Sequence, residues 1–220
     1  MGMETARLAQ LMGLMDGDGK HQQAATSTLE VLAVLYERVL RRDGPDEDHF
    51  LLSKGHGPQA YFAVLAESGC FPVGWLAGFG SFESPLGHHP DRTLVPGVEL
   101  SSGSLGHGLA IAAGLALGLA ATGRGGRVFC LVGDGELDEG SNHEAVVLAG
   151  RRRLAGLRVV AVDNGSSSLG WPGGLERRFT LEGWSARRVD GHDRDELESA
   201  LGAPAGGRPA LVVADVAKAR

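Results

Sequence analysis

Residues 133–164 read GDGELDEGSNHEAVVLAGRRRLAGLRVVAVDN, and this stretch decides the fold. Short apolar runs rich in valine stand at 127–132 (RVFCLV) and 157–162 (LRVVAV), as is typical of buried parallel strands. Between them, apolar residues recur at helical spacing over 139–153, and Gly156 follows as a stop signal. The pattern predicts a strand–helix–strand unit in an α/β fold with a parallel sheet flanked by helices.

Two polar residues stand where these predicted strands end. Asp134 lies at the carboxyl end of the first strand and Asn164 at that of the second. Open α/β sheets bind their ligands at this edge, so both side chains are candidates for a ligand site. Gly133 and Gly135 allow a tight turn and bring backbone N–H groups close to a ligand. The alternative is an ordinary unit in which the Asp and the Asn only form turns.

Composition limits the class of protein. A length of 220 residues suits one domain, and we predict a single domain over 1–220 because no repeat, linker or charge block interrupts it. The net charge of −6 argues against nucleic acid as the main partner. The apolar stretch 105–121 is too short to span a bilayer comfortably, and no signal peptide is visible. We therefore expect a cytoplasmic protein with no membrane partner, in which Cys70 and Cys130 are reduced thiols.

The rest of the chain predicts further helices and strands around one long ordered loop. That loop covers residues 80–100, which are rich in Gly, Pro and His, and loops of this length usually serve a function. We predict helices over 1–18, 26–41, 58–67, 101–122, from 175 onward and over 193–201, and strands over 50–52, 185–189 and 209–213.

Several segments, taken together and in order, resemble the transketolase family, and more closely its split form, in which the diphosphate-binding half is a separate polypeptide. The resemblance covers nearly the whole chain and implies a thiamine diphosphate-binding fold. The segments are GKHQQAATSTLEVLAVLYERVLR (19–41), HFLLSKGHGPQAYFAVLAESG (49–69), SPLGHHPDRTLVPGVELSSGSLGHGLAIAAGLALG (84–118) and GDGELDEGSNHEA (133–145).

The resemblance implies thiamine diphosphate and Mg²⁺ as cofactors. Mg²⁺ takes six oxygens at about 2.1 Å. Asp134, Asn164 and the backbone carbonyl of Ser166 are the implied metal ligands, and Gly133 and Gly135 approach the phosphates. Gly103 and Leu105 resemble positions beside the cofactor ring, although core packing is the alternative for Leu105.

The resemblance also assigns catalytic positions. His21 matches the position of a histidine that contacts the substrate in the family. His56 matches one that contacts the cofactor diphosphate and the reacting centre, and His89 matches the histidine of a Gly-His-Pro motif. Histidines suit proton transfer on sugar hydroxyls because their unperturbed pKa lies near neutrality. Glu139 resembles a glutamate at the subunit interface that links two active sites. The alternative role for Glu139 is that of a carboxylate favoured by the dipole at the start of a helix. We expect Glu136 to be a solvated or capping residue.

The chain departs from the family pattern in four places. Gln22, Gln23 and Ala24 replace small glycines after the first histidine, and His107 replaces a frequent Gln. Leu169 stands where transketolases often carry Asp, which predicts that a polar contact near the metal loop is absent. The sequence ends at VVADVAKAR, and from the resemblance we expect a domain that is shorter at its C-terminus than the family's.

The implied activity is the transfer of a two-carbon ketol unit from a ketose or its phosphate to an aldose, or to a specialised acceptor such as a carrier protein. The glutamate that activates the cofactor belongs to a pyrimidine-binding domain, for which this chain is too short. We expect a separate subunit to supply it in a heterotetramer of two plus two chains. The alternatives are a component of a 2-oxoacid dehydrogenase or decarboxylase, and a non-catalytic scaffold.

Overall fold

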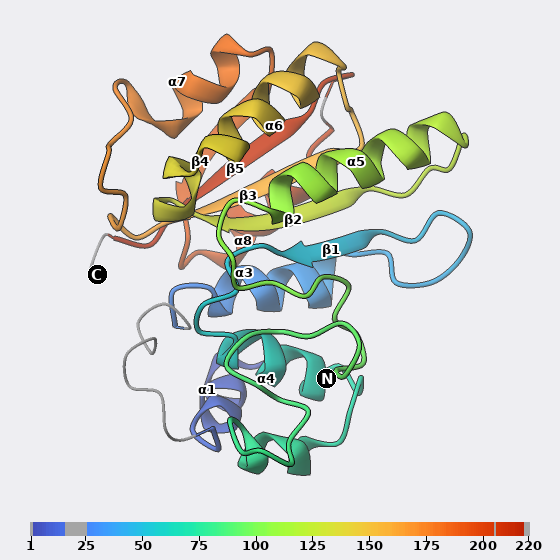
Figure 1. The fold of residues 1–220 in the computed structure, drawn as a ribbon, viewed down its shortest axis with the longest axis vertical. Helices are drawn as coiled ribbons and strands as arrows, with labels where there is room; N and C mark the ends of the chain where they lie inside the picture. Colours follow the sequence, from blue (N-terminus) through green and yellow to red (C-terminus); the bar gives the residue numbers. More distant parts are fainter. Residues whose placement is uncertain (1, 16–25, 205, 218–220) are drawn as a thin grey trace.

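The structure of the protein, a computed structural model, describes residues 2–15, 26–204 and 206–217. At its centre is a five-stranded sheet, in which each strand pairs in parallel with its neighbours in the order β1-β2-β3-β5-β4 (Figure 1). This arrangement confirms the predicted fold class. The strands are β1 (His49–Leu52), β2 (Val128–Gly133), β3 (Leu157–Asp163), β4 (Ser185–Asp190) and β5 (Ala210–Asp215).

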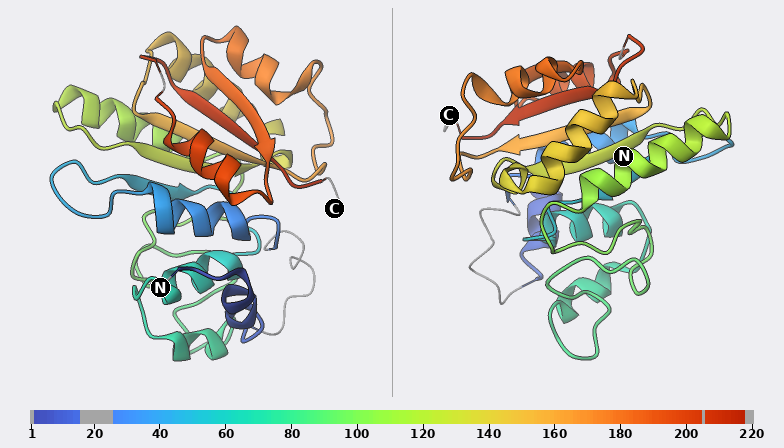
Figure 2. Two further views of the ribbon diagram at one scale, coloured as in Figure 1. Left: turned by 180° about the vertical axis from the view of Figure 1, so that it is seen from behind. Right: turned by 45° about the horizontal axis from the view of Figure 1, so that its top comes forward.

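Helices cover both faces of the sheet, which is why its central strands are apolar on both sides. Along β2, Val128 and Cys130 belong to the core on one face, and Phe129 and Leu131 to the core on the other. In Figures 1 and 2, α5, α6 and α7 lie over the first face, and α3 and α8, with α1 and α4 beyond, lie on the second. The helices are α1 (Thr5–Met12), α3 (Leu29–Val34), α4 (Gln59–Glu67), α5 (Gly108–Ala121), α6 (Gly140–Arg151), α7 (Gly174–Leu181) and α8 (Arg194–Gly202).

The handedness of the crossovers explains this division. From β1 through β2 and β3 to β4 the chain moves across the sheet in one direction, so right-handed connections put α5, α6 and α7 on one face. The step from β4 back to β5 reverses direction, and α8 falls on the other face. After β1 the chain first turns to α4, whereas after β2 it turns to α6 on the opposite face. The carboxyl ends of β1 and β2 therefore border the kind of crevice in which such sheets bind ligands.

The predicted strands agree with the structure, whereas some helix boundaries differ. The helix predicted over 26–41 consists of α3 followed by a π-helical turn, η1 (Leu35–Val39), which ends where the Leu40 N–H donates to the Leu35 carbonyl at 2.8 Å. The helix predicted from 101 begins only at Gly108, because the residues before it turn toward the crevice. In the part of the chain that the structure describes, no helix is long and apolar enough to cross a membrane.

A buried ion cluster fixes the amino ends of β1 and β2. The Asp48 side chain is fully buried and accepts hydrogen bonds from the guanidinium groups of Arg127 (2.6 Å) and Arg41 (2.8 Å), and from both of their backbone N–H groups (2.9 Å each). Burial alone would raise the pKa of the Asp48 carboxyl, but these hydrogen bonds prevail and hold the pKa well below its ordinary value.

We predict that Asp48→Asn lowers the free energy of unfolding by about 2–4 kcal/mol at pH 7, because it removes one partner of a buried ion cluster whose arginines are partly exposed. The folded-state pKa of Asp48 lies below its unfolded value of about 3.9, so its contribution is complete above that value and is lost as the pH falls through and below it. Urea unfolding of both proteins between pH 3 and 8 should show the difference shrinking at acid pH. A constant difference would contradict the assignment.

Candidate functional site

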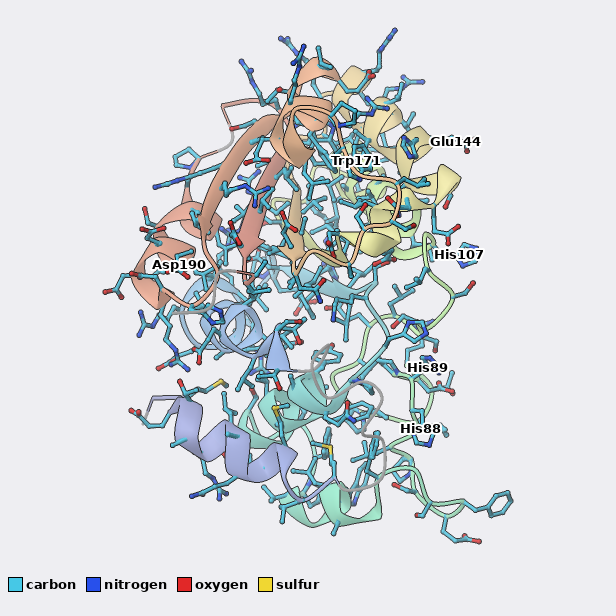
Figure 3. The ribbon with its side chains drawn as sticks, turned by 90° about the vertical axis from the view of Figure 1, so that its left-hand side faces the viewer. His88, His89, His107, Glu144, Trp171 and Asp190 are labelled. Atoms are coloured by element: carbon cyan, nitrogen blue, oxygen red, sulfur yellow. The ribbon has the colours of Figure 1, made fainter. Side chains whose placement is uncertain are left out.

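Four loops meet at the carboxyl edge of the sheet. They comprise residues 53–57 after β1, 102–108 before α5, 133–141 after β2 and 164–170 after β3. In Figure 3, His88, His89, His107 and Glu144 follow one another up the same side of the view, Trp171 lies nearer the middle at about the height of Glu144, and Asp190 lies at the opposite side. Residues from distant parts of the sequence therefore lie on one flank of the molecule.

The carboxylate of Glu136 joins three of these loops. Glu136 is 3% exposed, and its Oε1 accepts hydrogen bonds from the Ser53 hydroxyl and from the Gly106 N–H (3.1 Å), while Oε2 accepts from the Gly133 N–H (3.3 Å). The Ser53 Oγ in turn accepts from the Gly108 N–H at 3.1 Å. The expectation that Glu136 is solvated is therefore wrong: it lies on the short 3₁₀ helix η3 (Gly135–Asp138), which turns its side chain into the crevice.

Lys54 is a second charged group that the sequence did not single out. Its side chain runs across Gly133, with Cδ 3.3 Å from where a β-carbon on that glycine would stand. Burial lowers the pKa of the Lys54 ammonium to about 8, although the charges of Glu136 and Asp134 act in the opposite direction. Burial likewise raises the pKa of the Glu136 carboxyl, against the effect of its hydrogen bonds and of Lys54. Positive and negative charge thus lie close together in the floor of the crevice.

The three predicted metal ligands are close together in the structure. Asp134 is 2% exposed, and its Oδ2 accepts from the N–H of Ser166 at 2.6 Å, while its Oδ1 accepts from the Ser166 hydroxyl at 2.6 Å. The Oδ1 of Asn164 also faces the Ser166 N–H, at 3.2 Å. Gly135 allows this approach, since a β-carbon there would lie 3.2 Å from the Ser166 carbonyl oxygen.

These oxygens suit a hard divalent cation. Carboxylate, amide and carbonyl oxygens are the donors that Mg²⁺ prefers, and they come from the ends of two adjacent strands. Among the described residues there is no group of three or more His, Cys, Asp and Glu side chains that would make a different type of metal centre. The predicted ligands therefore fit Mg²⁺ by type and by proximity.

Contrary to expectation, the loop after β3 has a polar partner despite Leu169. Asp138, at the end of η3, accepts hydrogen bonds from Ser167, Ser168 and the Leu169 N–H. Burial alone would raise the pKa of its carboxyl, but these hydrogen bonds lower it below its ordinary value. The carboxylate expected within the loop is thus provided from outside it.

Two of the predicted histidines lie against each other. The rings of His56 and His89 meet edge to face with centroids 5.1 Å apart. Gly103 makes room for them: it adopts φ +140°, and a β-carbon there would lie 2.6 Å from Cδ2 of His89. Nearby, the Ser102 hydroxyl oxygen is buried and has no hydrogen-bond partner within the described ranges. A polar group of a ligand that reached this oxygen could form a hydrogen bond with it. This small-residue cradle suits a bound cofactor.

The other predicted residues lie around this pair. Leu105 is half-buried at the start of the turn into α5. Glu139 is exposed at the amino end of α6, and its side chain makes no capping hydrogen bond there. His88 packs against Phe79 (ring centroids 5.3 Å apart). His21 lies outside the described residues.

We predict that Glu136→Gln lowers the free energy of unfolding by about 1–3 kcal/mol, because the amide nitrogen must face a buried N–H donor and leave it without an acceptor. Glu144→Gln, an exposed change on α6, is the matched control and should stay within about 0.5 kcal/mol of the wild type. Urea denaturation measures both. Equal stability of the two variants would contradict the joining role of Glu136.

Comparisons with known proteins agree with this geometry. The family described as "Transketolase, thiamine diphosphate binding domain" matches residues 3–216. "Ferredoxin fas2" of Rhodococcoides fascians is 48% identical over 217 residues, covering 96% of this chain and 71% of the relative. A subunit of the apulose-4-phosphate transketolase of Actinobacillus succinogenes is 35% identical over 212 residues, covering 91% and 77%. This chain has two cysteines, too few for an iron–sulfur cluster held by four cysteine thiolates.

Among solved structures, the transketolase from Leishmania mexicana superposes with a TM-score of 0.80 at 27% identity, over 98% of this chain. The chain spans 37% of that protein's length. The match therefore concerns one part of a full transketolase, the part whose parallel sheet holds the crevice described above. The chain belongs to the transketolase family and corresponds to its thiamine diphosphate binding domain.

Proposed function

We propose that the chain is the thiamine diphosphate- and Mg²⁺-binding subunit of a two-component transketolase-like enzyme that transfers a two-carbon ketol unit. The observation that carries this proposal is the grouping of Asp134, Asn164 and Ser166 at the carboxyl edge of the sheet. A scaffold has no need of such a grouping. We infer a single thiamine diphosphate-binding domain over residues 1–220.

Thiamine diphosphate, when bound, supplies the carbanion that attacks a ketose carbonyl and holds the two-carbon fragment. The chain's own residues have three tasks. Asp134, Asn164 and the Ser166 carbonyl hold Mg²⁺, which neutralises the diphosphate, and Gly133 and Gly135 offer backbone N–H groups to it. Gly103 and Leu105 line the ring side of the cofactor.

His56 and His89 handle protons on substrate hydroxyls, and His56 also contacts the diphosphate. Their edge-to-face arrangement supports a shared task, because it holds the two rings at one position beside the cradle. His21 is the third histidine of this proposal and contacts the sugar. Lys54, which crosses Gly133, adds positive charge beside the phosphates.

The partner is a separate polypeptide that carries the pyrimidine-binding domain and its activating glutamate. Relatives named as transketolase subunits support this, namely the apulose-4-phosphate transketolase subunit and the "6-deoxy-6-sulfo-D-fructose transketolase subunit SqwG" of a Clostridium species, 33% identical over 213 residues. Exposed apolar residues, among them Ile111 on α5 (48% exposed) and Leu148 on α6 (43%), support self-association. Glu139 immediately precedes α6, so it lies both at the site and at one end of this apolar surface. Self-association through this surface would therefore place Glu139 between the sites of a two-plus-two heterotetramer.

The donor is a ketose or its phosphate, and the acceptor an aldose or a specialised acceptor such as a carrier protein. The substrates in the relatives' names are modified ketoses, which favours this class. Activity toward a 2-oxoacid is the competing function. Turnover of pyruvate but not of xylulose 5-phosphate by the assembled enzyme would favour that alternative.

We predict that Asp134→Asn weakens binding of thiamine diphosphate in the presence of Mg²⁺ by more than about 100-fold, since it removes the negative charge of a ligand and one of its two oxygens, a larger change than at a supporting residue. Calorimetric titration measures the affinity, and circular dichroism checks that the fold persists. Asp43→Asn, with the same charge change on the opposite edge of the sheet, should bind like the wild type. Unchanged affinity of Asp134→Asn would defeat the metal assignment.

We predict that the isolated chain shows no ketol transfer with xylulose 5-phosphate as donor. Affinity capture from the native cells in the presence of thiamine diphosphate and Mg²⁺ should retain a stoichiometric partner of roughly 300 residues, the size of one or two further domains. Adding that partner should restore transfer. Turnover by the chain alone would contradict the two-component arrangement.

A further inference from the structure

Two carboxylates hold the loop after β3: Asp134, which immediately precedes η3, and Asp138, which ends it. Asp134 accepts three hydrogen bonds, from the N–H and hydroxyl of Ser166 and from the N–H of Ser167 (3.0 Å). Asp138 accepts four, from the Ser167 hydroxyl, from the N–H and hydroxyl of Ser168, and from the Leu169 N–H. The four loop residues 166–169 are thus divided between the two acids, and Ser167 is bound by both.

The two carboxylates differ in what a cation would do to them. Oδ1 of Asp134 accepts a hydrogen bond from the Ser166 hydroxyl at 2.6 Å. A carboxylate oxygen that binds a divalent cation directs a lone pair at the metal, so this hydroxyl must turn away or share the oxygen. Cation binding therefore weakens part of the contact by which Asp134 holds the loop.

Asp138 has no such conflict. Its Oδ1 accepts from the Ser167 hydroxyl at 2.8 Å, and its Oδ2 from Ser168 N–H at 2.9 Å, Ser168 Oγ at 3.2 Å and Leu169 N–H at 3.2 Å. Both oxygens are thus engaged by the loop itself. Asp138 lies four residues from Asp134 along the chain, with η3 between them, so the two acids are held by one short rigid element.

The loop needs a holding contact of this kind. It is bounded by Gly165 (φ +74°) and Gly170 (φ +68°), which give its ends wide conformational freedom in the absence of other restraints. Leu169 is 74% exposed and offers no polar side chain. Without Asp138, the loop would be less ordered before the cation binds. Binding would then have to order it, and this loss of conformational entropy would lower the affinity for the cation.

We propose that Asp138 is a positioning residue for the divalent cation: it binds no metal but holds residues 167–169 so that the Ser166 carbonyl and Asn164 stay in place beside Asp134. This inference rests on the proposed function, because it presumes that the three groups bind a cation. It assigns a role to a residue for which the sequence alone suggested none.

Binding of Mn²⁺ to the full chain with saturating thiamine diphosphate, followed by electron paramagnetic resonance, tests this role. We expect Asp138→Asn to weaken Mn²⁺ binding by about 10–100-fold, the usual effect of changing a residue that supports a ligand. Ser167→Ala removes the hydroxyl that donates to Asp138 and accepts from the Gly170 N–H (3.2 Å) without changing charge, and should weaken binding about 3–10-fold, in line with the loss of these hydrogen bonds within the loop. Asp43→Asn is the charge-matched control and should bind like the wild type.

The outcomes separate the two levels of inference. If the wild type binds no Mn²⁺, the proposed function fails and the role of Asp138 with it. If the wild type binds but both variants equal it, only the positioning role is overturned. Weakening by Asp138→Asn alone, with Ser167→Ala unchanged, would mean that Asp138 acts only through its charge, which also overturns positioning. Hydrogen exchange at the Ser168 and Leu169 amides, faster in Asp138→Asn than in the wild type, gives a second readout that needs no metal.

Discussion

One buried carboxylate determines how the functional edge of this molecule is assembled. Glu136 receives the backbone N–H groups of Gly106 and Gly133 and the Ser53 hydroxyl, so the loop before α5 and the ends of β1 and β2 are all bound to one group. A buried charge is tolerated only when its hydrogen bonds are satisfied, and each donor here would be costly to leave unpaired. These segments therefore hold one another in place before any ligand arrives.

The charged side chains at this edge of the sheet bear on the proposed binding of a cation. Two buried carboxylates, Glu136 and Asp134, face one ammonium, Lys54, so the floor carries an excess of negative charge. A diphosphate would add to that excess in surroundings where charge repulsion is strong. Lys54 offsets part of it, and a divalent cation at Asp134 would offset the rest. The burial of Glu136 and Asp134 thus has two effects. It fixes the positions of the loops, and it would make binding of a diphosphate depend on the positive charge of Lys54 and of a cation.

Local structure could be predicted from the sequence, whereas structure that depends on long-range contacts could not. The strands around 127–132 and 157–162 could be predicted because burial on both faces leaves a continuous apolar run. The inward direction of Glu136 could not, since its partner Ser53 stands 83 positions away in the sequence. Similarly, the lack of an acid at Leu169 suggested a missing contact, whereas Asp138 supplies it from another loop. The grouping of His56 with His89 was expected only from resemblance, because nothing local to either residue requires it.

The exposed apolar surface of α5 bears on how the domain associates with other chains. This helix is apolar all round: Leu109 and Ala112 are buried, whereas Ile111 is 48% exposed and a β-carbon on Gly114 would meet nothing within 4 Å. Helices of this composition are normally covered on every side. Small residues also leave the backbone open to close approach by another helix. α6 packs against α5 and begins at the site itself. A partner chain that covered the amino end of α5 would therefore also lie close to the amino end of α6, because Gly106, just before α5, stands against Glu139 and Ser141.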